Sequence, residues 1–237
     1  MKIKNEIFLP GGLHQAEFLI KNVSPDDKKT LIIGGGSEDI AEYLARNFNG
    51  SFYVITDDND SLMRARLKLS GYKNVNARLM DFNVTDFKDE FFDIVYSQGS
   101  ISVSGRNKIV KEIKRVLKPD GYFCAGEITA LQKDVPTFIK DVWERSGIAP
   151  LFVDDLPAYY SERKFTTVAE EDYSPFLLNY YRICDFLSKD KVESISEDER
   201  KYFKKIINKL SHEANVYLRQ GGDKHIGFYA LLLKKES

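Results

Sequence analysis

Small and acidic residues recur in the first half of the chain, and each group directly follows a short apolar segment. These are Gly34–Gly36, Asp57 and Asp81. Glycine lets the backbone approach a ligand closely, and a carboxylate at the end of a strand accepts hydrogen bonds from a ribose diol. The pattern therefore predicts that successive loops hold one nucleotide-like ligand.

The same loops contain further candidate binding residues, which are Glu38, Asp58, Phe82, Ser97 and Gln98. Asp81 is placed to accept a hydrogen bond from an exocyclic adenine amine, and Phe82 offers an apolar face for the ring. Each assignment has a structural alternative. Asp57 also suits a helix cap, Asp81 a turn and Phe82 the core.

The apolar segments before these loops are expected to be strands, at residues 30–33, 51–56, 75–80, 92–97, 122–128, 164–170 and 225–234. Helical periodicity separates them and is clearest around residues 109–117, where apolar side chains fall on one face. Strands that alternate with helices form a parallel sheet covered on both sides. The expected fold class is α/β, doubly wound, with a mostly parallel seven-stranded sheet and an antiparallel last strand.

The composition is globular and bounds the function. The chain has 237 residues, 35 basic and 36 acidic side chains, and a formal net charge of -1. A near-neutral balance argues against a nucleic-acid-binding protein. No apolar run reaches the roughly 18 residues of a membrane span. Two cysteines and three scattered histidines indicate no metal site, and we expect a cytoplasmic protein.

Residues 31–128 resemble the class I S-adenosylmethionine-dependent methyltransferases. The segment LIIGGGSEDIAEYLA is similar to the first motif of that family, and VITDDNDSLMRAR is similar to its second strand and acidic loop. The stretch EIKRVLKPDGYFCAGE is the most specific match. PGGLHQAEFLI, NYYR and GFYALLLK also resemble a small-molecule branch related to the ubiquinone methyltransferases.

This resemblance implies a Rossmann-like fold, S-adenosylmethionine as cofactor and methyl transfer to a small molecule. It divides the chain into an entry segment, a cofactor-binding core, a helical lid or oligomerisation insert and a final strand of the core sheet, at residues 1–29, 30–173, 174–222 and 223–237. Within the insert we expect helices at 176–187 and 197–219. The expected partner is a small-molecule acceptor, and the insert also suits a homodimer interface.

Two residues depart from the family pattern. Ile32 stands where the family has an acidic residue that helps hold the methionine amino group, and Glu38 stands where it has glycine. Glu38 could take over that contact. The departures leave open an alternative, a catalytically degenerate binding or scaffold protein. A nicotinamide-dependent dehydrogenase is disfavoured because its motif requires glycine at Asp39.

No residue is assigned as catalytic, because methyl transfer from a sulfonium depends largely on positioning. Glu127 is a candidate general base and His14 a second titratable candidate, although each also suits a structural role. Candidate substrate-contacting residues are Tyr159, Tyr160, Tyr180 and Tyr181, for which the alternative is a place in the core.

Overall fold

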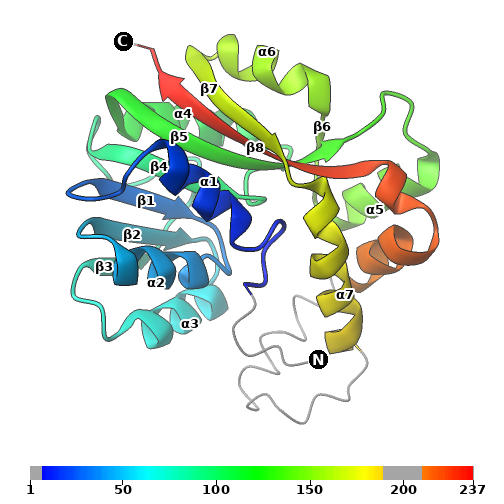
Figure 1. Ribbon diagram of the computed structural model, residues 1–237, viewed down its shortest axis with the longest axis horizontal. Coiled ribbons are helices and arrows are strands. Elements are labelled where there is room, and N and C mark those ends of the chain that lie inside the picture. The colour runs from blue at the N-terminus through cyan, green and yellow to red at the C-terminus, as the bar shows by residue number, and fades with distance from the viewer. Residues whose placement is uncertain (1–6, 189–209, 237) are drawn as a thin grey trace.

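The computed structural model describes residues 7–188 and 210–236. Its strands form one sheet in the order β3-β2-β1-β4-β5-β8-β7, and β6 pairs with β5 beside this path (Figure 1). The strands are β1 (Lys29–Ile33), β2 (Ser51–Thr56), β3 (Val75–Leu79), β4 (Phe92–Gln98), β5 (Leu117–Ala130), β6 (Leu151–Phe152), β7 (Phe165–Asp172) and β8 (Ile226–Lys235).

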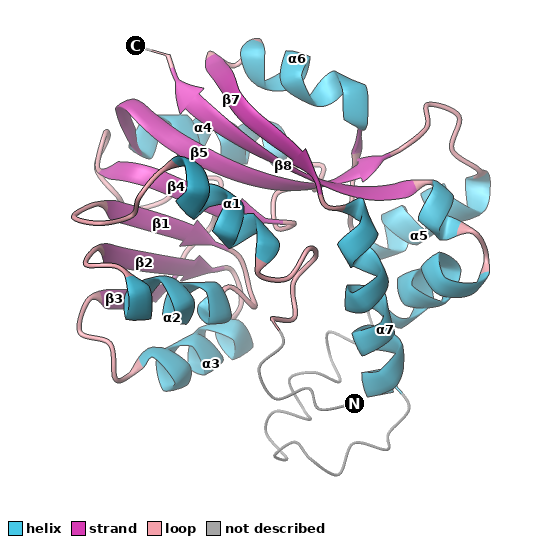
Figure 2. Cartoon of the chain, in the orientation of Figure 1, coloured by secondary structure: helices cyan, strands magenta, loops and turns pink. Residues whose placement is uncertain are grey.

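The α-helices lie on both faces of the sheet (Figure 2). They are α1 (His14–Asn22), α2 (Glu38–Asn47), α3 (Asn59–Leu69), α4 (Arg106–Val116), α5 (Thr137–Ser146), α6 (Leu156–Ser161) and α7 (Leu177–Ser188), and residues 210–219 are also helical. Apolar side chains of α1, α2, α3, α5 and α7 pack into one core cluster, while those of α4 and α6 pack into the other. The expected α/β fold with both faces covered is confirmed.

The parallel strands end together at one edge of the sheet. The last residue of β1, Ile33, is in register with Ile55 of β2 and with Ser97 of β4. Chain order reverses at β1, because β2 lies on one side of it and β4 on the other. In such sheets, ligands bind beyond the carboxyl ends of the strands at this reversal. The glycine turn after β1 therefore lies at the expected site.

Two features of the sheet differ from the expectation. The last strand, β8, is antiparallel as expected, but it inserts between β5 and β7 and pairs with both. The short elements β6 and α6 were not predicted, because two and six residues are too few to display a period.

The region after residue 173 begins with a 3-10 turn at Ser174–Phe176 and continues as α7, close to the expected helix at 176–187. Most of the second expected helix, 197–219, lies outside the described residues. The proposed boundaries of the four segments stay predictions. No helix in the described ranges has the length and apolar character needed to cross a membrane.

Candidate functional site

The glycine turn after β1 has a backbone suited to residues without a Cβ. Gly34 has a φ of 123° and Gly36 a φ of 82°. A Cβ on Gly34 would lie 2.6 Å from the Cβ of Ser100. The Ser100 hydroxyl donates a 2.8 Å hydrogen bond to the carbonyl of Ile33 and lies 2.9 Å from the hydroxyl of Ser97. Contacts with the loop after β4 therefore hold the turn in place.

Residues 8–12, here called the N-terminal strap, are bound to the end of β4. The Gln98 amide donates hydrogen bonds to the carbonyl oxygens of Pro10 and Gly12, at 2.7 and 2.8 Å. Its own oxygen accepts a 2.6 Å hydrogen bond from the hydroxyl of Tyr96. Gln98 was predicted as a cofactor-binding residue. In the structure its buried amide joins the strap to the sheet.

A pocket of about 100 Å³ lies between the glycine turn and the strap. It is lined by Phe8, Leu9, Gly35, Gly36, Asp39, Arg64 and Tyr180. The rings of Phe8 and Tyr180 are 5.3 Å apart, so α7 helps to cover the turn. Pockets that enclose a whole small molecule measure about 300–1,000 Å³. This pocket therefore accommodates one end of a ligand.

The Glu38 side chain is completely buried beside this pocket. The Nε atom of Arg64, from α3, lies 2.8 Å from Oε1 of Glu38. Burial raises the pKa of Glu38, and the positive charge of Arg64 opposes that shift. Among the described residues, neither Glu38 oxygen accepts a hydrogen bond of good geometry. Cofactor binding by Glu38 stays a prediction, and in the structure Arg64 is its ion partner.

The next acidic residue, Asp39, belongs to the same charged group. It lines the pocket and accepts a hydrogen bond from the Lys68 ammonium. The Nη2 atom of Arg64 lies 3.9 Å from Asp39, beyond hydrogen-bond distance. Lys68 is thus the ion partner of Asp39, and Arg64 is the ion partner of Glu38.

Ile32 has no polar role in the structure. Its side chain is fully buried and packs in the apolar cluster that contains Ile40 and Leu44 of α2. Ile32 therefore offers no hydrogen-bond acceptor to a ligand at the glycine turn.

The two acidic residues after β2 are in different environments. Asp58 caps α3, because its carboxylate accepts hydrogen bonds from the backbone N–H and the hydroxyl of Ser61, at 3.0 and 2.6 Å. Asp57 is exposed. The capping role considered for Asp57 thus falls to Asp58, which was predicted to bind cofactor. Asp57 remains a candidate for ribose binding.

The residues after β3 match their structural alternatives. Asp81 accepts hydrogen bonds from the backbone and side-chain N–H groups of Asn83, at 2.8 and 2.7 Å. These hydrogen bonds lower the pKa of Asp81. Phe82 is buried in the apolar cluster beneath α4. Contacts of these two residues with adenine stay a prediction.

Glu127, the candidate base, belongs to a closed polar network. Its carboxylate accepts hydrogen bonds from the hydroxyls of Ser102 and Tyr160, at 2.5 and 2.6 Å. The Nε atom of Arg106 lies 3.1 Å away. Glu127 is completely buried, so its surroundings are those of a structural residue.

The four candidate tyrosines do not form one pocket. Tyr159 and Tyr160 belong to α6, and Tyr160 packs in the cluster shared with α4. Tyr180 and Tyr181 belong to α7, on the opposite face of the sheet. Tyr181 is buried and donates a hydrogen bond to Glu213. Tyr180 is the one of the four that lines the pocket at the glycine turn.

His14 starts α1, and its ring centroid lies 3.8 Å from that of Phe176. Its Nδ1 atom is 3.3 Å from a carboxylate oxygen of Glu17. His14 is not among the lining residues of the pocket at the glycine turn. A catalytic role for this residue stays a prediction.

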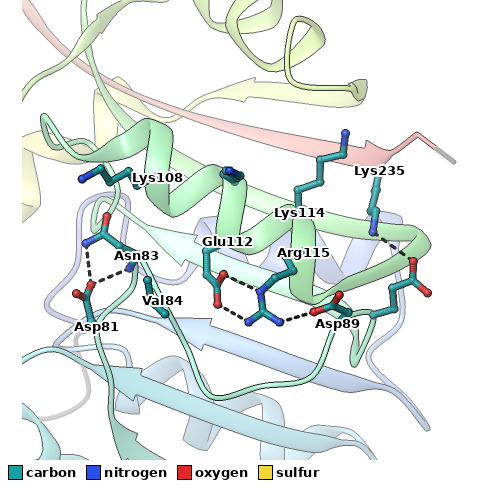
Figure 3. Close-up of a pocket in the computed structure, with 11 residues that line it drawn as sticks. Asp81, Asn83, Val84, Asp89, Lys108, Glu112, Lys114, Arg115 and Lys235 are labelled. Carbon is teal, nitrogen blue, oxygen red and sulfur yellow. Dashed lines mark hydrogen bonds and ion pairs between the residues drawn. The ribbon is translucent and has the colours of Figure 1, made fainter.

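A hollow of about 810 Å³ lies between the segment after β3 and α4 (Figure 3). Figure 3 shows Arg115 between the carboxylates of Glu112 and Asp89, to which it donates hydrogen bonds of 2.6–2.8 Å. These charged groups bind one another, and ten of the eleven residues that line the hollow are charged or polar. We therefore place the functional site at the glycine turn.

Sequence reasoning missed Arg64. The signal was present in principle, because a carboxylate at the position of Glu38 needs a nearby cation if it is buried. Arg64 and Lys68 are one helical turn apart, so they share a face of α3. The sequence does not say that this face turns towards Glu38.

The known proteins that are similar to this chain include methyltransferases. Residues 31–125 match a family described as a methyltransferase domain. The chain is 31% identical over 101 residues to the ubiquinone/menaquinone biosynthesis C-methyltransferase UbiE of Pectobacterium atrosepticum, a match that covers 40% of each protein. It is 29% identical over 184 residues to UbiE of Bartonella quintana, with 70% of each protein covered.

A solved structure shows the same fold. It is the phosphoethanolamine N-methyltransferase 2 of Haemonchus contortus in complex with S-adenosyl-L-methionine. The TM-score is 0.78 at 16% identity, and the match covers 98% of this chain but 55% of that one. The match thus spans about half of that enzyme, 40% of the Pectobacterium atrosepticum UbiE and 70% of the Bartonella quintana UbiE.

Proposed function

Because the chain belongs to the class I S-adenosylmethionine-dependent methyltransferases, we propose that it transfers a methyl group from S-adenosylmethionine to a small-molecule acceptor. The observation that carries the proposal is the glycine turn at the reversal of strand order, with the exposed Asp57 at the end of the neighbouring strand. This turn lies within the matched family segment, residues 31–125.

The residues present fit this cofactor. Gly34 and Gly36 leave backbone free of Cβ atoms at the end of β1, which suits the close approach of a ligand. Asp57 would accept hydrogen bonds from the ribose hydroxyls. When bound, S-adenosylmethionine supplies a methyl group on a positively charged sulfur that leaves readily. The protein then needs to position the acceptor and exclude water.

A small acceptor is favoured by the cover over the site. The N-terminal strap lies across the glycine turn, and Tyr180 of α7 packs against Phe8 of the strap. Because Leu9 of the strap and Tyr180 of α7 both line the pocket at the turn, this arrangement suits a small acceptor better than a macromolecule. Tyr180 is the candidate tyrosine best placed to meet an acceptor.

The first test is thermal unfolding with S-adenosylmethionine and with S-adenosylhomocysteine. A ligand at 100 times its dissociation constant stabilises a protein by about 2.7 kcal/mol. We expect each ligand to raise the Tm of the wild-type chain. The same ligands should not raise the Tm of Gly34→Ala, because the added Cβ would collide with Ser100 and disturb the turn. Transfer of labelled methyl groups to pooled metabolites would then identify the acceptor class.

The buried Ile32 favours a second candidate, a binding protein that has lost activity. A measurement of methyl transfer to acceptor pools distinguishes the two functions. A ligand-dependent shift without methyl transfer to any acceptor pool supports the binding protein, whereas turnover of any acceptor excludes it.

A further inference from the structure

We propose that Gln98 ties the N-terminal strap over the glycine turn, and that the breaking of this tie controls the rates at which the cofactor enters and leaves. The inference rests on the proposed function and concerns the same site. It makes Gln98, the last residue of β4, a positioning residue that acts on the cofactor through the strap.

The strap forms one wall of the small pocket at the glycine turn. Leu9 of the strap lines this pocket together with Gly35 and Gly36. The Cδ2 atom of Leu9 lies 3.3 Å from the position that a Cβ on Gly36 would occupy. The pocket measures about 100 Å³, whereas a site that encloses a whole small molecule measures about 300–1,000 Å³. A movement of the strap away from the turn therefore opens the space that a cofactor requires, and its return covers the ligand.

Gln98 binds the strap at two points. Its side-chain amide nitrogen donates hydrogen bonds to the carbonyl oxygens of Pro10 and Gly12, at 2.7 and 2.8 Å. An amide NH2 group carries two N–H donors, so both are used in this contact. Gln98 is only 3% exposed, so water does not readily compete for these hydrogen bonds. One residue of the sheet thus holds the strap at both Pro10 and Gly12.

Tyr96 supports the orientation of this amide. Its hydroxyl donates a 2.6 Å hydrogen bond to Oε1 of Gln98. Burial raises the pKa of the Tyr96 hydroxyl well above its usual value, so the hydroxyl keeps its proton and stays a donor. With the amide turned over, Oε1 would face two carbonyl oxygens, and none of these three oxygens has a proton to donate. The tie therefore has one favoured orientation, and it depends on two side chains of β4.

The strap can move without the helix that follows it. Gly12, its last residue, has a φ of 58°, which glycine adopts readily, and a Cβ there would meet no atom within 4 Å. Helix α1 begins two residues later, at His14. A separate glutamine holds α1 to the sheet, because the amide of Gln15 donates a 2.9 Å hydrogen bond to the carbonyl of Ser97. Gly12 thus provides a hinge between a strap tied by Gln98 and a helix tied by Gln15.

This arrangement predicts a kinetic effect. The ligand passes while the strap is open, so the association rate and the dissociation rate both depend on the fraction of time for which the strap is open. The hydrogen bonds from Gln98 lower that fraction in the free and in the bound protein alike. Their loss should therefore raise both rates and leave Kd, the ratio of the two, nearly unchanged. Loss of a residue that contacts the cofactor would instead change mainly the dissociation rate, and Kd with it.

The test measures both rates for S-adenosylhomocysteine by surface plasmon resonance on the immobilised full chain. Gln98→Met keeps a side chain of similar length and removes its hydrogen-bond donors. We expect both rates to rise by about fivefold or more, and Kd to stay within about twofold of wild type. Tyr96→Phe should raise both rates by a smaller factor, and it serves as the test if Gln98→Met fails to fold.

Gln15→Met is the matched control, because it removes a buried glutamine amide that binds β4 from α1 and makes no contact with the strap carbonyls. It should leave both rates within about twofold of wild type. Limited digestion with chymotrypsin reports on the strap without any ligand, because cleavage after Phe8 requires the strap to leave the turn. Gln98→Met should be cut there faster than the wild type and faster than Gln15→Met.

Three results would overturn the inference and leave the proposed function standing. They are an association rate that Gln98→Met does not change, equal increases of both rates in Gln15→Met, and equal cleavage after Phe8 in Gln98→Met and wild type. If the wild-type chain binds neither S-adenosylmethionine nor S-adenosylhomocysteine, the proposed function fails together with this inference.

Discussion

Two buried glutamates, each paired with an arginine, lie at the carboxyl ends of strands in this protein. Glu127 at the end of β5 has hydrogen bonds from Ser102 and Tyr160 in addition to its contact with Arg106. Glu38 beside β1 has Arg64 as its ion partner and no hydrogen bond of good geometry within the described residues.

The two carboxylates differ in how completely hydrogen bonds satisfy them. Both oxygens of Glu127 accept a hydrogen bond, and a carboxylate satisfied in this way stabilises one conformation. A pair that borders a pocket and is incompletely satisfied costs stability, and a ligand can offset that cost. Burial of a carboxylate alone would have suggested the same role for both residues.

The largest effect is expected at Glu127. Glu127→Leu leaves the buried Arg106 without its counter-ion and the hydroxyls of Ser102 and Tyr160 without their acceptor, so we expect a loss of about 3–5 kcal/mol in the free energy of unfolding. Denaturant titration would measure it. The double variant R106M/E127L should recover part of the loss, since it removes the unpaired charge. A loss below about 1 kcal/mol would mean that the network is not structural.

An effect of intermediate size is expected at Asp57 and Asp58, which should differ in whether their substitution changes stability or ligand binding. Asp58→Ala removes the cap of α3 and should cost about 1 kcal/mol of stability. Asp57→Asn should leave the Tm of the free protein unchanged and weaken S-adenosylhomocysteine binding by about tenfold. The comparison is made by thermal unfolding and calorimetry of both variants. The reverse pattern would show that Asp57 is the structural residue.

The smallest effect is a pH dependence at Glu38. Burial raises its pKa in the folded protein, so its favourable contribution is complete below the unfolded value of 4.5 and is lost as pH rises through the folded pKa. The wild-type chain should therefore gain stability relative to Glu38→Gln as pH falls from neutral towards 4.5. The slope is at most about 1.4 kcal/mol per pH unit.

Glu112 is the control of opposite sign. Burial alone would raise its pKa, but hydrogen bonds from Arg115 and Thr85 outweigh burial and lower it. Its contribution is present above the unfolded pKa and lost in acid. Chemical denaturation should therefore show the wild-type chain gaining stability relative to Glu38→Gln as pH falls from neutral towards 4.5, and losing stability relative to Glu112→Gln as pH falls below 4.5. A wild-type advantage over Glu38→Gln that shrinks as pH falls towards 4.5 would contradict the assignment for Glu38.

Much of the fold could be predicted because its strands carry their own signal. The expected strand at 51–56 coincides with β2, and those at 30–33 and 92–97 differ from β1 and β4 by one residue at one end. These segments are apolar enough for central strands and are bounded by glycine or charged residues. The place of β8 between β5 and β7 carried no such signal, since pairing order is not a local property.

The candidate site was predictable in its backbone and less so in its side chains. A run of three glycines after an apolar strand predicts a turn that admits a ligand, because the allowed φ values depend on the residue itself. The roles of Asp57 and Asp58 were not separable from sequence. The cap depends on which residue begins α3, and helix ends are uncertain by one or two residues.

The sequence by itself determined the buried strands, the glycine turn and the resemblance to a methyltransferase family, because these follow from local composition and spacing. Only the tertiary structure decided that Arg64 meets Glu38, that Glu127 is enclosed by hydroxyls, and that Tyr160 and Tyr180 lie on opposite faces of the sheet. Such contacts join residues distant in the chain, and they exist only once the helices have packed on the sheet.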